Sequence, residues 1–124
     1  MKNLKNFAAI LMLLFIAGSI SAQTAKTKEI SIKVSSQCNK CKETIEKTLA
    51  FEKGIVKSEV DIETSTVKVT YKPSKTTPEA IRKAISMAGY DADNIAADPK
   101  AYSRLSDCCK KPADRQSMGT NHNN

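Results

Sequence analysis

The sequence predicts an α+β fold in which two helices cover one side of a single β-sheet. Three short segments alternate apolar and polar residues with a period of two, which is typical of half-buried strands. Two other segments repeat apolar residues at every third or fourth position, as amphipathic helices do. Each strand then has one apolar face and each helix one apolar stripe. Both helices must therefore pack against the same side of the sheet, which gives a two-layer sandwich.

The first strand and the first helix follow from a change in this period. Apolar residues alternate with polar ones from residue 30 to 34. Cys41, Ile45 and Leu49 then recur at every fourth position, which predicts a helix that begins near Cys41. Gly54 follows the end of this helix, where a C′ glycine is expected.

The middle of the chain predicts a hairpin and a second helix. Residues 55–62 and 67–71 alternate as strands, with a tight turn at residues 63–65. Thr77 is the expected N-cap of the second helix, and Pro78 its first residue. The helical crossover between the first two strands leads us to expect a split βαβ arrangement, with the first and third strands parallel.

The chain after the second helix predicts less regular structure. Residues 90–95 contain three Asp or Asn residues, so the fourth strand that would lie beside the first is expected to be very short or absent. Residues 100–105 are expected to form a short C-terminal helix. Residues 110–124 are polar, and we expect them to form a disordered tail.

Residues 1–22 have the layout of a secretory signal peptide. Lys2 and Lys5 precede an apolar run at residues 7–17, and small residues lead to an expected cleavage site after Ala22. The run is shorter than the about 20 residues that a membrane span needs, although an uncleaved anchor is the alternative. We therefore expect a periplasmic or secreted protein with no membrane segment after cleavage and a short lead-in at residues 23–28.

Composition excludes some classes of function. The net charge is +7, but the lysines are spread along the chain among acidic residues, and aromatic residues make up 5%. A nucleic-acid surface would need clustered Arg and Lys with stacking aromatic rings, so we expect no nucleic-acid partner. The single histidine, His122, lies in the polar tail, and no Ser-His-Asp set or carboxylate pair stands out. We therefore expect a monomer that is not an enzyme.

The chemistry is concentrated in four cysteines: Cys38, Cys41, Cys108 and Cys109. Cys38 and Cys41 flank the start of the first helix, where unpaired N–H groups and the helix dipole favour thiolates. Soft thiolates select Cu(I) and similar ions. Two sulfurs suit a near-linear d¹⁰ ion such as Cu(I) or Hg(II), whereas Zn(II) usually takes four ligands. Disulfides persist after export, so the cysteine count alone leaves both a disulfide frame and a metal site open.

Cys108 and Cys109 are adjacent, and adjacent cysteines rarely bridge one another. A disulfide favours Cα atoms about 5.5 Å apart, against about 3.8 Å for neighbouring residues. Our hypothesis is that this segment folds back and adds one or two thiolates to the site of Cys38 and Cys41; the alternatives are disulfides to Cys38 or Cys41 and an independent tail with free thiols. A structural bridge between Cys38 and Cys41 would close too small a loop to stabilise the fold much.

Three motifs carry a resemblance to a known family. A Cys-Asn-Lys-Cys motif at residues 38–41 lies between the first strand and the first helix, Gly-Ile-Val at 54–56 opens the second strand, and Ala-Gly-Tyr at 88–90 closes the second helix. In this order they resemble a heavy-metal-associated domain over residues 29–95. That domain is the small ferredoxin-like module of copper chaperones, copper-pumping ATPases and the periplasmic mercury-binding protein. Residues 96–109 then form a C-terminal extension that carries the second cysteine pair.

The resemblance implies a binding function with Cys38 and Cys41 as metal ligands. It places Tyr90 near the thiolates, although a core-packing role is equally open, and Lys40 adds positive charge beside them. Cu(I) is the expected ion, followed by Hg(II) and then Zn(II) or Cd(II). The expected partner is a metal-transporting ATPase or another metal-accepting domain. Serines at 35 and 36 replace the family's usual Gly-Met, which bears on the rigidity of the loop.

A thiol–disulfide oxidoreductase that uses the same two cysteines is the alternative from a different class. Such sites usually carry an aromatic residue before the first cysteine, and Gly-Pro or Pro-His between the two. Gln37, Asn39 and Lys40 occupy these positions here, which argues against a redox enzyme.

Overall fold

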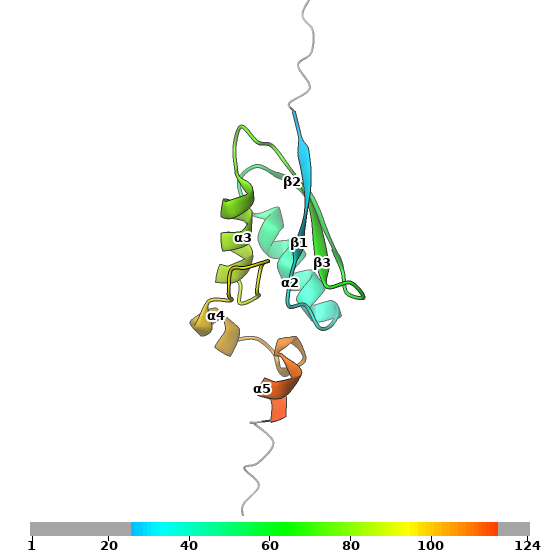
Figure 1. The fold of residues 1–124 in the computed structure, drawn as a ribbon, viewed down its shortest axis with the longest axis vertical. Helices are drawn as coiled ribbons and strands as arrows, with labels where there is room; N and C mark the ends of the chain where they lie inside the picture. Colours follow the sequence, from blue (N-terminus) through cyan, green and yellow to red (C-terminus); the bar gives the residue numbers. More distant parts are fainter. Residues whose placement is uncertain (1–25, 117–124) are drawn as a thin grey trace, which may run out of the picture.

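The structure is a computed structural model that describes residues 26–116. Its elements confirm the predicted order and the α+β class (Figure 1). The elements are β1 (Lys28–Lys33), α2 (Asn39–Ala50), β2 (Ile55–Asp61), β3 (Thr66–Tyr71), α3 (Pro78–Met87), α4 (Pro99–Ser103), the 3₁₀ helix η2 (Asp107–Cys109) and α5 (Pro112–Gln116). The signal peptide predicted at residues 1–22 lies outside the described residues. Among residues 26–116, no helix has the length and apolar composition needed to cross a membrane.

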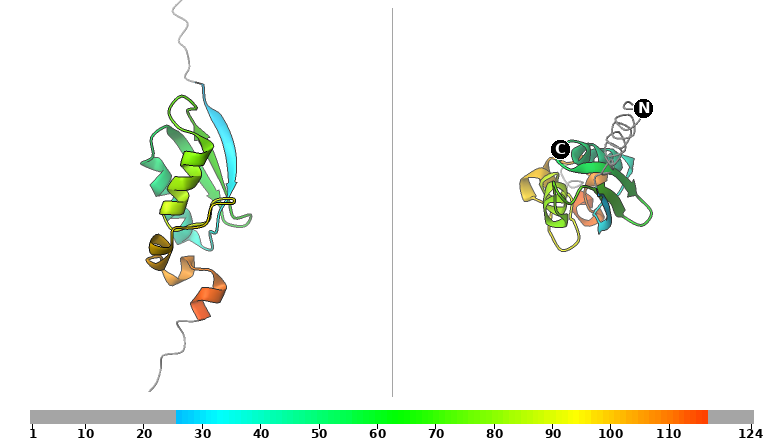
Figure 2. Two further views of the ribbon diagram at one scale, coloured as in Figure 1. Left: turned by 60° about the vertical axis from the view of Figure 1, so that its left-hand side comes forward. Right: turned by 90° about the horizontal axis from the view of Figure 1, so that it is seen from above.

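The sheet has three strands in the order β1-β3-β2, and both pairs are antiparallel. The expectation that the first and third strands are parallel was therefore wrong. The crossover through α2 makes β1 parallel to β2, and the hairpin places β3 between them. Both long helices lie on one face of the sheet, as the sandwich prediction requires (Figure 2).

The core fills the space between this face and the helices. Cys41, Ile45 and Leu49 of α2 are fully buried, and Val67 of the central strand β3 faces Ile32 and Val60 in the ladder. The helical period and the strand alternation therefore predicted the buried faces correctly. Because Cys41 is part of this core, its position is fixed by packing as well as by the helix.

The fourth strand is reduced to an isolated bridge between Val34 and Ala92, as the composition of residues 90–95 predicted. Asp93 extends this contact from a left-handed backbone conformation, with φ of 50°. Its N–H donates to the carbonyl of Lys33 at 2.8 Å, and its Oδ1 accepts from the N–H of Lys33 at 2.8 Å. Its Oδ2 accepts from Nε of Arg82, also at 2.8 Å. Asp93 thus makes some of the hydrogen bonds that a complete fourth strand would make along β1.

The C-terminal segment, residues 98–116, folds back towards the N-terminal end of α2 (Figure 1). It contains α4, close to the helix predicted at residues 100–105, followed by η2 and α5. The prediction of disorder from residue 110 was wrong for α5. The Tyr102 hydroxyl hydrogen-bonds to the Asp114 carboxylate, and Arg115 donates from Nη2 to the carbonyl of Cys108 at 2.9 Å, so this short helix is tied to the rest of the segment. Residues 117–124 lie outside the described residues.

Gly89 allows the C-terminal segment to approach the domain closely. It adopts φ of +102° at the end of α3, and a Cβ at this position would lie 3.0 Å from the carbonyl carbon and oxygen of Ala101. The absence of a side chain therefore lets α4 pack directly against the turn that leads to Tyr90.

Candidate metal centre

The predicted Cys38–Cys41 pair lies at the start of α2. Cys38 is the N-cap residue, and Cys41 lies in the first turn. Their Sγ atoms are 3.5 Å apart, and the backbone N–H of Gln37 donates to Sγ of Cys41 at 3.4 Å. Cys41 is fully buried and Cys38 is half-buried, so one thiol is anchored in the core while the other is accessible.

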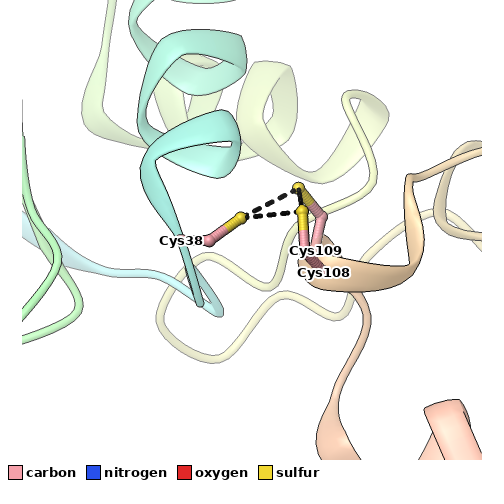
Figure 3. Close-up of side chains that lie close together, drawn as sticks. All are labelled: Cys38, Cys108 and Cys109. Atoms are coloured by element: carbon pink, nitrogen blue, oxygen red, sulfur yellow. Dashed lines mark hydrogen bonds between the residues drawn. The ribbon is translucent and has the colours of Figure 1, made fainter.

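The second cysteine pair meets the first. The Sγ atoms of Cys38 and Cys108 are 3.0 Å apart, although the two residues are 70 positions apart in the sequence. Sγ of Cys109 lies 3.7 Å from Sγ of Cys38 and 3.9 Å from Sγ of Cys108 (Figure 3). All four cysteines are free thiols. The structure therefore brings together the residues that the fold-back hypothesis required to meet, with Cys38 at the centre.

The thiols of Cys38, Cys108 and Cys109 have shifted pKa values. Burial alone would raise the pKa of Cys38, but its hydrogen bonds with Cys108 and Cys41 lower that pKa to about 6. The hydrogen bond with Cys38, and then burial, raise the pKa of Cys108. Burial, followed by the interaction with Cys41, raises the pKa of Cys109. The shifts favour the thiolate at Cys38 and the thiol at Cys108 and Cys109, so these two must release protons when they ligate a metal.

Tyr90 lies beside this cluster, where the sequence placed it. Its side chain is fully buried, and its hydroxyl lies beside Cys109 and Thr44 but makes no hydrogen bond of ordinary geometry among residues 26–116. Burial raises the pKa of the Tyr90 phenol, and interactions with the nearby Cys109 and Cys41 contribute. Lys40 is exposed on α2 and makes no side-chain hydrogen bond or ion pair within the described residues, so its proposed electrostatic role stays a prediction.

Asp91 joins three parts of the molecule around the site. Its N–H donates to Oγ of Ser35 in the loop before Cys38, at 2.9 Å. Its Oδ1 accepts from the N–H of Ala97 at 2.9 Å, and its Oδ2 pairs with Nζ of Lys111 at 2.8 Å. Burial opposes ionisation of Asp91, but the hydrogen bond from Lys111 and that from the Ala97 N–H outweigh it, so the pKa falls below the ordinary value. Sequence reasoning missed Asp91 and Lys111, because a charge in a polar stretch gives no signal of a partner 20 residues away.

Comparison with known proteins identifies the family. The model of the heavy-metal-associated domain matches residues 32–91. A mercuric transport protein periplasmic component from Shewanella putrefaciens is 36% identical over 81 residues, which cover 64% of this chain and 88% of that protein. The chain belongs to the heavy-metal-associated domain family.

Two further relatives are named for copper, and a solved structure superposes on this chain. The copper chaperone CopZ of Staphylococcus epidermidis is 38% identical over 54 residues, which cover 44% of this chain and 79% of that protein. Copper-transporting ATPase 1 of Rattus norvegicus is 34% identical over 67 residues, which are 53% of this chain and only 4% of the ATPase. The structure of oxidized MerP from Ralstonia metallidurans CH34 superposes with a TM-score of 0.53 and 29% identity, over 55% of this chain and 96% of that one.

Family membership confirms the ferredoxin-like fold and a heavy-metal-binding function that is not enzymatic. Family membership therefore excludes the alternative of a thiol–disulfide oxidoreductase. Cys38 and Cys41 lie within the matched residues 32–91, and Cys108 and Cys109 lie beyond them.

Proposed function

We propose that the protein is an exported carrier that binds a soft heavy-metal ion, Cu(I) by preference, through Cys38 and Cys41. The observation that carries this proposal is the pair of free thiols 3.5 Å apart at the start of α2. The buried Cys41 supplies a fixed sulfur, and the half-buried Cys38 supplies one that a second protein can reach. Such an arrangement suits transfer by stepwise exchange of thiolate ligands.

Copper is favoured by the chemistry of the donors. Thiolates are soft ligands, and a site rich in them selects Cu(I) over hard divalent ions. A member of the same family that is named as a copper chaperone shares 38% identity with this chain over 54 residues. The proposed acceptor is a metal-accepting domain of similar fold, such as that of a metal-transporting ATPase.

Mercury(II) is the second candidate, and one observation favours it. The relative from Shewanella putrefaciens is named as a periplasmic component of mercuric transport, and the match spans 88% of its length. The layout of residues 1–22 supports export of this chain to the same kind of compartment. Cell fractionation with an antibody to the protein tests export: recovery in the cytoplasm with residues 1–22 intact would contradict it.

Competition titration tests the metal site. The reduced protein is titrated with Cu(I) against a chelator of known affinity, beside the C38S/C41S variant and, as a matched control, S31A in β1. We expect the unmodified chain and S31A to take Cu(I) from the chelator and the double variant to fail. Equal binding by all three proteins would refute a site at Cys38 and Cys41. Repeating the series with Hg(II) ranks the two ions.

A further inference from the structure

The matched family domain ends at residue 91, but the core of this protein does not. Cys109, in η2, is 3% exposed and belongs to the core cluster that contains Cys41 and Tyr90. Burial of this thiol requires that the segment around it pack against the domain. The C-terminal segment is therefore part of the architecture around the metal loop.

We propose that Cys108 and Cys109 complete the metal site, so that the ion is held by three or four thiolates, two of which come from residues 98–116. This inference rests on the proposed function, because Cys38 is shared by both versions of the site. The ion would then be bound by more sulfur ligands than Cys38 and Cys41 supply.

The distances between sulfurs support a common ion. A tetrahedral centre with bonds of about 2.3 Å from metal to sulfur has sulfurs about 3.8 Å apart. Around Cys38 the separations are 3.5 Å to Cys41, 3.0 Å to Cys108 and 3.7 Å to Cys109. Sγ atoms of Cys38, Cys108 and Cys109 all lie within 4.8 Å of one another. With 3.9 Å between Cys108 and Cys109, these separations bracket the value expected for sulfurs that share one ion.

The segment that carries the second pair is held in place by contacts of its own. Lys111, two residues after Cys109, pairs with Asp91 at 2.8 Å, and Asp91 also contacts the loop before Cys38. Arg115 donates to the carbonyl of Cys108 from the other side, at 2.9 Å. The sulfurs of Cys38, Cys108 and Cys109 are thus gathered before any ion arrives, with that of Cys41 3.5 Å from Cys38, which lowers the entropic cost of forming the site.

An independent observation points to a ligand at this position. Tyr90 is fully buried beside Cys109, Cys41 and Thr44, and its hydroxyl makes no hydrogen bond of ordinary geometry with any described residue. A buried hydroxyl without a partner is unfavourable, so it calls for an acceptor. Metal-bound thiolates are acceptors that retain negative charge, and a closed thiolate centre would satisfy this donor.

The inferred ligand class is a soft d¹⁰ ion that accepts three or four sulfurs. Cd(II) and Zn(II) meet this description when four thiolates are available, and Cu(I) and Hg(II) also take three. Because residues 98–116 supply two of the sulfurs, such a centre retains its ion until a competing thiol displaces the segment.

Cd(II) serves as the probe for the test. The full chain is reduced and titrated with Cd(II) under chelator competition, and X-ray absorption counts the sulfur neighbours of the ion. The same measurements are made on C108S/C109S, on C38S/C41S, and on C108S/C109A, which keeps the buried position 109 apolar. Circular dichroism of each metal-free variant checks that the fold is retained.

We expect three or four sulfurs per Cd(II) in the unmodified chain and two in either variant of the second pair. The affinity of those variants should fall at least about 100-fold, the upper end of the loss seen when only an outer-shell partner of a metal ligand is removed. Two sulfurs in the unmodified chain, with affinity unchanged in C108S/C109S, would overturn the inference and leave the site at Cys38 and Cys41 standing. Unchanged binding in C38S/C41S would overturn the proposed function itself.

Discussion

Replacing Tyr90 by phenylalanine should change stability and metal affinity in opposite directions. In the metal-free protein the buried hydroxyl makes no hydrogen bond of ordinary geometry within residues 26–116, and its polar neighbours are Thr44 and Cys109. Leaving such a group unpaired costs about 1–3 kcal/mol. The Tyr90→Phe substitution removes this cost and leaves the ring in place. The free energy of unfolding of the metal-free variant should therefore rise by about 1 kcal/mol.

In the metal-loaded protein, the Tyr90→Phe substitution should instead remove a favourable interaction and lower the metal affinity. Once Cys109 and Cys41 ligate an ion, the Tyr90 hydroxyl has charged sulfur acceptors beside it, and a hydrogen bond to a charged group contributes about 1.5–3 kcal/mol. Because about 1.4 kcal/mol corresponds to a factor of ten, the variant should bind the ion about 10- to 100-fold more weakly.

Two measurements on one variant test this pair of effects. Urea unfolding of the reduced, metal-free protein gives the stability, and Cu(I) competition gives the affinity. Tyr71→Phe is the matched control, since Tyr71 is another buried tyrosine, 4% exposed, and lies at the end of β3. A loss of stability in Tyr90→Phe with unchanged Cu(I) affinity would refute the reasoning and leave Tyr90 as a packing residue.

Three further substitutions probe the surroundings of the site. Gly89→Ala places a Cβ 3.0 Å from the backbone of Ala101 at a positive φ, so unfolding free energy should fall by at least about 2 kcal/mol and Cu(I) affinity should fall with it. Asp93→Asn removes a carboxylate whose pKa is lowered chiefly by its hydrogen bond with Arg82. That contribution, about 1 kcal/mol after allowance for solvent screening, is present above the ordinary aspartate pKa of about 3.9 and is lost as pH falls through the lowered value. The variant should thus be less stable than the unmodified chain at pH 7 and equal to it near pH 2, and an equal gap at both pH values in urea unfolding would contradict this origin. Ser36→Ala removes a buried hydroxyl that has no partner among the described residues, so the melting temperature should rise, and a lower one would show that the hydroxyl is satisfied.

Local patterns predicted the elements and the buried faces well. The four-residue spacing of Cys41, Ile45 and Leu49 placed one face of α2 in the core, and all three are fully buried. The period of a strand says which side chains share a face, but it does not say which strand lies next to which. The expected parallel pairing of the first and third strands was wrong for this reason, since the order of strands is fixed only when the hairpin packs beside β1.

The candidate site was predictable where chemistry and position coincide. The Cys38–Cys41 spacing at a helix start identified the metal loop, and the oddity of adjacent cysteines suggested that Cys108 and Cys109 meet it. The contacts that hold the second pair in place were not predictable. The ion pair of Asp91 and Lys111 depends on the path of the chain through α4, and that path is set by packing against Gly89.

The reduced fourth strand leaves β1 as an edge of the sheet. Beyond the contacts at Lys33 and Val34, no residue in the described part of the chain pairs with its outer side. An open edge is a template onto which a strand from another molecule can add, and charged side chains are a common defence against such growth. Lys28, Glu29 and Lys33 put three charges on this short strand. β1 and β2 are the two edges of the sheet, and the charges on β1 oppose the addition of a strand there. Neutralising these three charges should therefore increase self-association of the protein at high concentration.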